Sequence, residues 1–247
     1  MKDDYKKYIK KVNIYRNEPP LWLVIIFKSI FTAFLICCLI VALFNFTHIG
    51  TPVSGSSMKP TLNNYQNLTT KDYVYISRFV GYGSSDIIVI NNPENENTNK
   101  FVIKRLIATE GDKLAIIRTD GGIYSVPTGT YKIVKLINNE IVEISEPYLP
   151  EGTSLYWSYL EWEDLISKPE ITGAKKIVFN GITFLEIQSG YVFYMGDNRS
   201  SKSASKDCLE YGPVEKSKVV GKVSIIAYEN KNHFSHIFMH YIHKIFG

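Results

Sequence analysis

The sequence predicts a mainly β protein that one helix near the N-terminus anchors in a membrane. An apolar run covers Leu21–Phe44, and most of the chain after it consists of short segments rich in Val, Ile, Tyr and Phe. Many short segments of this kind, separated by Gly and Asn turns, are typical of β-barrels and sandwiches. The chain has 247 residues, 45% of them hydrophobic, which is enough for one large domain or for a domain with an insertion.

The apolar run at 21–44 has the length of a transmembrane helix. It reads LWLVIIFKSIFTAFLICCLIVALF, which is 24 residues with Lys28 as the one charge. At about 1.5 Å per residue, such a helix exceeds the roughly 30 Å hydrocarbon core of a bilayer. It is also longer than the apolar stretch of about 7–15 residues in a cleaved signal peptide. Lys28 lies near the start, from where its side chain can reach the interface.

The charges on either side of this run predict its orientation. Residues 1–20 contain six basic residues, which are Lys2, Lys6, Lys7, Lys10, Lys11 and Arg16. In the twenty positions after Phe44, Lys59 is the one basic residue. Because cytoplasmic flanks carry the excess of positive charge, we expect a single-pass cell-membrane protein with its N-terminus in the cytoplasm. The part that follows the anchor would then be extracellular.

Charge and cysteine content exclude some classes of function. The formal net charge of +4 is too small to indicate a nucleic-acid partner. Cys37 and Cys38 are adjacent within the apolar run, and Cys208 is alone, so no disulfide framework is expected. We also expect no cofactor.

Ten segments beyond the anchor have the composition of β-strands. They lie at 73–80, 86–90, 100–109, 113–119, 132–137, 140–145, 175–179, 182–187, 191–195 and 218–228. Turn signals separate several of them, at 120–122 (Asp-Gly-Gly), 138–139 (Asn-Asn) and 180–181 (Asn-Gly). The sequence therefore predicts short strands joined by tight turns.

Two helices are also expected in the part of the chain beyond the anchor. One covers 154–167, and the other is a short amphipathic helix in the tail at 231–247. The tail helix would pack on the core or lie at the membrane interface. His236 and His240 are one turn apart on it, but no carboxylate or cysteine joins them, so no metal site is predicted.

The segment VSGSSMKPTLNN, at 53–64, contains several serines and a lysine. Ser56 and Lys59 fit the S-x-x-K pattern of penicillin-recognising enzymes, which needs the two residues one helical turn apart. Pro60 disfavours helical geometry at Lys59 and favours an extended conformation there. Lys59 is therefore interpreted as a solvated loop lysine.

A nucleophilic serine needs a group that removes its proton. Of the histidines, His48 lies at the membrane boundary and the others lie in the tail, so a Ser-His-Asp triad is not expected. A lysine can serve as the base if burial lowers its pKa from about 10.4. Lys104 lies in a predicted strand between Val102 and Leu106 on one face. Spacing alone supports this role and that of an edge-strand lysine equally.

Three segments in the sequence, in this order, have specific motifs. They are Ser-Met-x-Pro-Thr at 57–61, Lys-Arg at 104–105 followed by Gly-Asp at 111–112, and Gly-Asp-Asn-Arg at 196–199 followed by Ser205, Asp207 and Gly212. Together with the N-terminal anchor, they resemble the boxes of bacterial type I signal peptidases. These are membrane-bound serine proteases that remove signal peptides. The single anchor is similar to that of Gram-positive members.

The resemblance implies a Ser–Lys dyad on a mainly β, antiparallel sheet or barrel. Ser57 would be the nucleophile, Lys104 the general base, and Ser205 the group that orients the lysine amine. Met58 would line the substrate pocket. A supporting charged shell would comprise Asp197, Arg199, Asp207 and Arg105.

The third box departs from the family pattern. Five residues separate Arg199 from Ser205 where the family usually has two, so Ser201 or Ser203 could replace Ser205. Leu209 stands where an arginine is usual, which leaves the charged shell incomplete.

The expected function is removal of signal peptides from exported proteins through an acyl-enzyme. Expected partners are those signal peptides, the lipid bilayer and the secretion translocon. The alternative is a non-catalytic, signal-peptidase-like assembly factor for surface structures such as pili. The expected organisation is a cytoplasmic segment (1–20), an anchor (21–44), a catalytic core in two parts (45–112 and 189–230), an inserted non-catalytic lobe (113–188) and the tail (231–247).

Overall fold

The structure is a computed structural model that describes residues 19–64, 70–91, 101–122, 124–199 and 207–228. It divides into two compact units, Met1–Thr47 and His48–Gly247. The predicted tail helix at 231–247, with its histidines, lies outside the described residues, and so do Ser201, Ser203 and Ser205.

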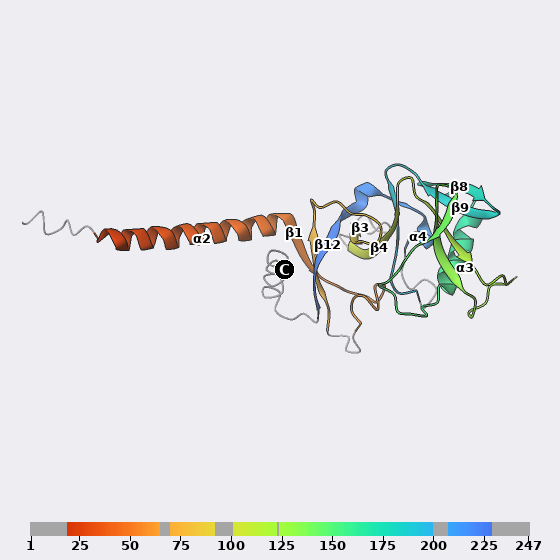
Figure 1. Cartoon of the computed structure of the whole chain (residues 1–247), viewed down its shortest axis with the longest axis horizontal. Helices are drawn as coiled ribbons and strands as arrows, with labels where there is room; N and C mark the ends of the chain where they lie inside the picture. Colours follow the sequence, from red (N-terminus) through yellow and green to blue (C-terminus); the bar gives the residue numbers. More distant parts are fainter. Residues whose placement is uncertain (1–18, 65–69, 92–100, 123, 200–206, 229–247) are drawn as a thin grey trace, which may run out of the picture. The chain divides into compact units, whose positions relative to one another are not determined.

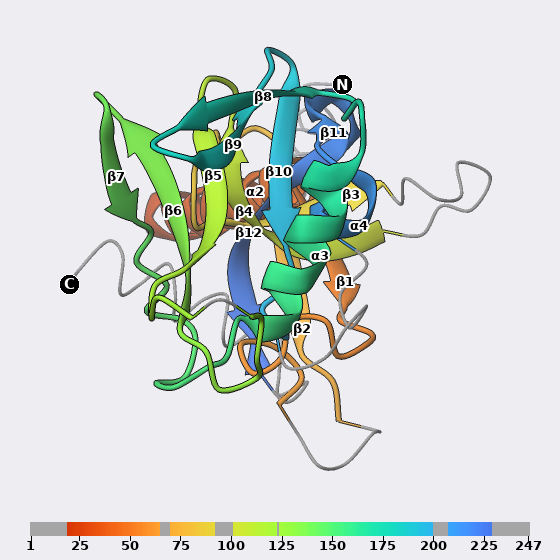
Figure 2. The ribbon, with the colours of Figure 1, turned by 90° about the vertical axis from the view of Figure 1, so that its right-hand side faces the viewer.

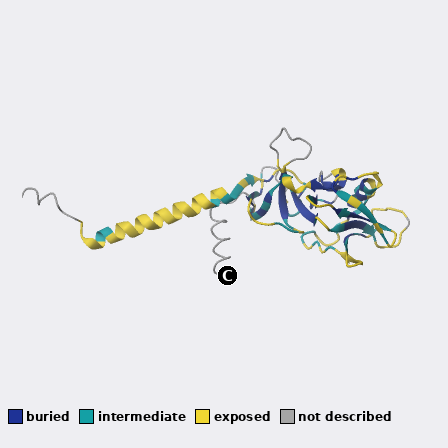
Figure 3. Cartoon of the chain, turned by 90° about the horizontal axis from the view of Figure 1, so that it is seen from above, coloured by how far each residue is buried: buried dark blue, intermediate teal, exposed yellow. Residues whose placement is uncertain are grey.

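The first unit contains the predicted apolar helix, α2 (Leu21–Thr47). The helix has 27 residues, and none of them is buried within the protein (Figure 3). A helix that is apolar on all sides and has no buried residue fits a lipid environment. Among the described residues, α2 is the one helix that is long and apolar enough to cross a bilayer. The predicted apolar helix is confirmed, and it continues three residues beyond Phe44.

The second unit contains two antiparallel sheets (Figure 1). The larger sheet has seven strands. In spatial order they are β1 (His48–Pro52), β2 (Tyr73–Ser77), β12 (Val219–Ala227), β3 (Ile87–Asn91), β4 (Phe101–Thr109), β10 (Tyr191–Met195) and β11 (Val214–Glu215). Strand β4 pairs with β3 over Phe101–Arg105 and with β10 over Arg105–Thr109, so Lys104 lies on the part of β4 that pairs with β3.

The smaller sheet has five strands. In spatial order they are β7 (Glu140–Glu143), β6 (Tyr131–Ile137), β5 (Lys113–Arg118), β9 (Ile182–Ile187) and β8 (Ala174–Phe179). Two tight turns close its hairpins, with positive φ at Asn138 (51°), Asn139 (63°), Asn180 (50°) and Gly181 (77°). Asn and Gly adopt this conformation most readily, and two consecutive residues with positive φ match the twist of a two-residue hairpin. Two of the three predicted turns are thus confirmed, while the third, at 120–122, lies in the longer connection between Arg118 at the end of β5 and Tyr131 at the start of β6.

One hydrophobic cluster joins the two sheets and a helix. It includes Leu106 of β4, Leu114 of β5, Phe184 of β9 and Phe193 of β10. Helix α3 (Tyr156–Ser167) adds Trp162, whose ring centroid lies 6.4 Å from that of Phe193. Figure 2 shows α3 beside β10 and the short helix α4 (Cys208–Tyr211). The continuous core links the larger sheet rigidly to the smaller one.

The predicted fold class is confirmed, since every predicted strand overlaps a strand of the structure. The elements that the sequence did not predict are short: β1, β11, α4 and the 3-10 turn η1 (Lys216–Lys218). Strand β1 reads HIGTP, and its Gly and Pro are depleted in strands. It forms because it pairs with β2 at the edge of the sheet, where Pro is tolerated. The predicted division into core and inserted lobe stays a prediction.

Candidate active site

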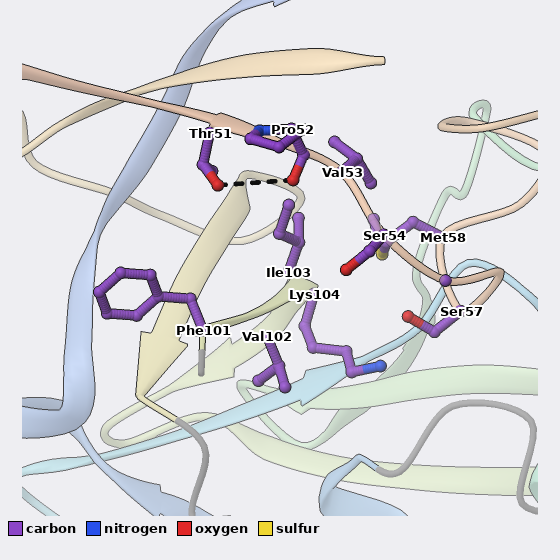
Figure 4. Close-up of a pocket in the computed structure, with 11 residues that line it drawn as sticks. Thr51, Pro52, Val53, Ser54, Ser57, Met58, Phe101, Val102, Ile103 and Lys104 are labelled. Carbon is purple, nitrogen blue, oxygen red and sulfur yellow. Dashed lines mark hydrogen bonds between the residues drawn. The ribbon is translucent and has the colours of Figure 1, made fainter. Parts of the chain in front are cut away.

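Two segments that are far apart in the sequence form the walls of one pocket (Figure 4). Its volume is about 530 Å³. The lining residues are Thr51, Pro52, Val53, Ser54, Gly55, Ser57, Met58, Phe101, Val102, Ile103 and Lys104. The structure therefore brings Ser57, Met58 and Lys104 together, as the motifs led us to expect.

Ser57 lies in a loop that follows β1 and turns tightly on itself. Gly55 has a φ of +94°, a conformation that side chains with a Cβ rarely adopt. The Lys59 amide donates to the Ser56 carbonyl at 3.1 Å, and the Leu62 amide donates to the Met58 carbonyl at 2.9 Å. These consecutive turns present the Ser57 side chain at the pocket. Figure 4 shows the Lys104 amine pointing toward the Ser57 hydroxyl.

Lys104 lies on β4, opposite Ile88 of β3, and is only 2% exposed. Burial lowers the pKa of Lys104 from 10.5 to about 8, although the negative charges of Asp207, Cys208 and Asp197 offset part of this effect. An amine with a pKa near the working pH is neutral in an appreciable fraction of molecules, and a neutral amine can accept a proton. The environment thus provides the condition that a lysine base requires.

Lys59 is not among the residues that line the pocket. Lys59 and Pro60 lie in a turn and not in a helix. The hydrogen bond between the Lys59 amide and the Ser56 carbonyl maintains this turn. Lys59 is half-buried and lies outside the pocket.

Met58 closes the base of the loop that contains Ser57. It is 3% exposed and packs in a second hydrophobic cluster with Val53, Leu62 and Val74. Because Met58 belongs to both the cluster and the pocket lining, it fixes the loop to the larger sheet and also shapes the pocket.

Arg105, the residue after Lys104, forms a two-pronged ion pair with Asp197. Its Nε and a terminal nitrogen donate to the two carboxylate oxygens of Asp197 at 2.8 and 2.6 Å. The Thr61 hydroxyl donates to the same carboxylate at 2.5 Å. Both partners of the ion pair are buried, so the pairing is needed to keep the charges inside the protein.

Arg199 is buried beside Glu146, a residue that sequence reasoning did not single out. Its terminal nitrogens donate to the Glu146 carboxylate at 2.7 and 3.4 Å, and its Nε donates to the Gly196 carbonyl at 2.6 Å. Burial by itself would lower the pKa of Arg199, but the Glu146 carboxylate holds it above its ordinary value.

Tyr148 is a second member of the site that the sequence did not reveal. Its hydroxyl donates to Glu146 at 2.7 Å, and its ring lies 3.6 Å from the guanidinium carbon of Arg105. Burial, together with Glu146, raises the pKa of the hydroxyl, so Tyr148 acts as a neutral donor. Both residues lie in a loop between predicted elements, where no periodic pattern marks a residue as buried.

Asp207 obtains its partners from the backbone. Its carboxylate accepts hydrogen bonds from the Gly196 amide at 3.1 Å and the Leu209 amide at 3.0 Å. Burial raises the pKa of Asp207, while these bonds and the charges of Lys104 and Arg199 act in the opposite direction. The side chain of Leu209 packs in the main core, at the position where an arginine was expected.

The chain belongs to the signal peptidase family, peptidase S26, whose sequence profile matches residues 24–228. It is 26% identical over 176 residues to signal peptidase I U of Bacillus subtilis (strain 168), covering 71% of this chain and 73% of that protein. It is 39% identical over 74 residues to subunit 1 of the mitochondrial inner membrane protease of Xenopus tropicalis, covering 29% and 41%. A signal peptidase I crystal structure from Enterococcus faecalis V583 aligns with a TM-score of 0.34 and 23% identity, covering 59% and 98%.

These comparisons confirm the predicted resemblance to bacterial type I signal peptidases. At the level of the family, they support a peptidase that acts on the signal peptides of exported preproteins. Helix α2 fits the membrane anchor of such a protein. The roles of the individual site residues and the orientation in the membrane are taken up below as proposals.

Proposed function

We propose that this protein is a membrane-anchored serine endopeptidase that removes N-terminal signal peptides, with Ser57 as nucleophile and Lys104 as general base. The observation that carries this proposal is that Ser57 and a buried Lys104 line one pocket, with the amine pointing toward the hydroxyl (Figure 4). The pKa of about 8 for that amine supports its role as a proton acceptor.

The proposed reaction proceeds in two stages. Neutral Lys104 takes the proton from Ser57 as the serine Oγ attacks the carbonyl carbon of the scissile peptide bond. The resulting lysine ammonium donates that proton to the departing amine, which leaves an ester between the signal peptide and Ser57. Lys104 then deprotonates a water molecule that hydrolyses the ester. Backbone amides such as that of Ser57 stabilise the oxyanion, at about 3–4 kcal/mol per donor.

The pocket walls favour an extended substrate. One wall comes from the end of β1 and the loop after it, and the other comes from residues 101–104 at the start of β4. An extended peptide between two such segments can form backbone hydrogen bonds as an added strand. The apolar side chains of Val53, Val102 and Ile103 favour small apolar groups near the scissile bond.

The anchor would bring enzyme and substrate to the same membrane. Ser57 follows the last residue of α2, Thr47, by ten positions in the chain. A signal peptide is itself held in the bilayer, so a tethered enzyme meets its cleavage site at a raised effective concentration. We propose that residues 1–20 face the cytoplasm and that the second unit faces outward. External protease that digests the second unit in intact cells would support this orientation, whereas full protection would contradict it.

The test is cleavage of a preprotein by the purified full chain in detergent. We expect wild type to release the signal peptide and Ser57→Ala to release none, because the nucleophilic oxygen is absent. Ser56→Ala is the matched control, since the Ser56 side chain is exposed and does not line the pocket. The alternative function, a non-catalytic assembly factor for pili, predicts no cleavage by any of the three proteins.

A further inference from the structure

We infer that Glu146 and Tyr148 are positioning residues of the active site. They hold two buried arginines, and through them the segment 196–198, on which the loop after β1 that contains Ser57 rests; this loop is called the nucleophile loop below. This inference depends on the proposed function, because it concerns the same Ser57 and Lys104. It assigns to the loop after β7 a part in catalysis that its place in the chain does not suggest.

The first step of the argument is that the nucleophile loop is docked on the segment 196–198. The Asn198 amide donates to the Ser57 carbonyl at 3.0 Å, and the Asn198 side chain donates to the Ser56 carbonyl at 3.2 Å. On the other side of Ser57, the Thr61 hydroxyl donates to Asp197. The position of the Ser57 backbone therefore depends on the position of residues 197 and 198.

The second step is that two arginines hold this segment in place. Arg105 binds the Asp197 carboxylate with two nitrogens and uses its third to donate to the Ser85 carbonyl at 2.7 Å. Arg199 holds the segment through its bond to the Gly196 carbonyl. Arg105 also follows Lys104 directly on β4. The Arg105–Asp197 ion pair therefore connects the strand that carries the base to the segment that supports the nucleophile loop.

The third step is that Glu146 and Tyr148 complete the surroundings of both arginines. Glu146 supplies the carboxylate for the terminal nitrogens of Arg199, and the side chains of this pair are 10% and 1% exposed. Tyr148 connects the two arginines, because its ring stacks on Arg105 and its hydroxyl binds Glu146. An arginine so deeply buried cannot replace a lost carboxylate with water at small cost.

Neither residue lines the pocket, so neither is expected to touch the substrate. Their loss should displace the segment 196–198 and misalign the Ser57 oxygen relative to the Lys104 amine. A misplacement of about 1 Å in a catalytic site can lower the rate by about 100-fold. The effect should therefore be seen in kcat, with little change in KM.

The deciding experiment compares Glu146→Gln with Glu143→Gln in the full-length protein, with a preprotein as substrate. Glu143 lies three residues earlier, and its side chain is 54% exposed in a pair with Lys132. We expect Glu146→Gln to lower kcat by about 10- to 100-fold with KM within about twofold, and Glu143→Gln to leave both unchanged. Glu146→Asp keeps the charge on a shorter arm, so its kcat should fall between those of Glu146→Gln and wild type.

All rates are expressed per folded molecule, with the folded fraction taken from thermal melting followed by circular dichroism. A wild-type kcat for folded Glu146→Gln would overturn the inference. If that variant does not fold, Tyr148→Phe decides, because it keeps the ring over Arg105 and removes only the hydroxyl. We expect its kcat to fall severalfold, and an unchanged kcat would overturn the inference. Failure of the proposed function looks different, because wild type would then not cleave, or Ser57→Ala would cleave equally well.

Discussion

Ion pairs of similar length occupy opposite environments in two regions of this protein. Around β4 and β10, Arg105 and Asp197 meet at 2.6 Å with side chains that are 7% and 0% exposed. On the smaller sheet, Lys132 of β6 and Glu143 of β7 meet at 2.5 Å, with side chains that are 39% and 54% exposed. Exposed pairs contribute about 0–1 kcal/mol, whereas loss of one partner from a buried pair costs about 3–5 kcal/mol. Burial, and not distance, therefore determines how much the loss of each pair lowers the free energy of unfolding.

The buried charges are also concentrated near the pocket. Among the described residues, the charged side chains that are buried are Asp72, Lys104, Arg105, Asp197, Arg199 and Asp207. None of them lies on β5–β9, the strands of the smaller sheet. Because burial of charge opposes folding, its concentration in one place indicates a functional constraint on that region.

The largest expected effect concerns Lys104. Lys104→Ala removes the proton acceptor, and Lys104→Arg replaces it with a group that stays charged. We expect each to lower the initial rate of preprotein cleavage by about 10⁴-fold or more. Lys59→Ala, which alters a nearby lysine outside the pocket, should cleave at the wild-type rate. Substantial cleavage by Lys104→Arg would show that another group is the base.

The next effect tests the buried pair by removing one charge without changing shape. Asp197→Asn leaves Arg105 buried without its anionic partner and weakens the contact with Thr61. We expect the free energy of unfolding to fall by about 3–5 kcal/mol, measured by urea denaturation of the second unit. A loss below about 1 kcal/mol would mean that the buried pair contributes no more to stability than the exposed pair on the smaller sheet.

A third prediction concerns the cost of burying Lys104. Its pKa of about 8 in the folded protein lies below its value of 10.5 without burial, so the group opposes folding below about pH 8. Lys104→Met should therefore raise the free energy of unfolding at pH 7 by on the order of 3 kcal/mol. Because the unfolded chain holds the proton more tightly, the difference from wild type should disappear as pH rises from about 8 to 10.5.

The same pKa determines the pH dependence of wild-type cleavage. The kcat/KM should rise with pH and level off above about 8, since the free enzyme requires a neutral lysine. A value of kcat/KM that does not change with pH would contradict the role of Lys104 as base.

The stability prediction has its own contradicting outcome. If the stability difference between Lys104→Met and wild type does not vary between pH 8 and 10.5, burial does not lower the pKa of Lys104.

The smallest effect belongs to the exposed region. Lys132→Ala breaks the pair with Glu143 on the smaller sheet. We expect the free energy of unfolding to change by less than about 1 kcal/mol and the cleavage rate to stay the same. A loss as large as that of Asp197→Asn would remove the contrast between the two regions.

Much of this protein follows from local features of the sequence. The length of the apolar run predicted α2, and the Asn-Asn and Asn-Gly pairs predicted two hairpin turns. The motifs around Ser57 and Lys104 singled out two segments that line one pocket in the structure. Each of these signals depends on residues close together in the chain, which can be recognised without knowledge of the fold.

Other features depend on how the two sheets pack. The contact of Arg199 with Glu146 joins residues 53 positions apart, and that of Arg105 with Tyr148 joins residues 43 apart. Glu146 and Tyr148 lie in a loop, where the chain has no period that marks a buried side chain. Only the packed sheets bring these groups beside the arginines and exclude water from them. The exclusion of water strengthens the electrostatic interactions between the charged groups.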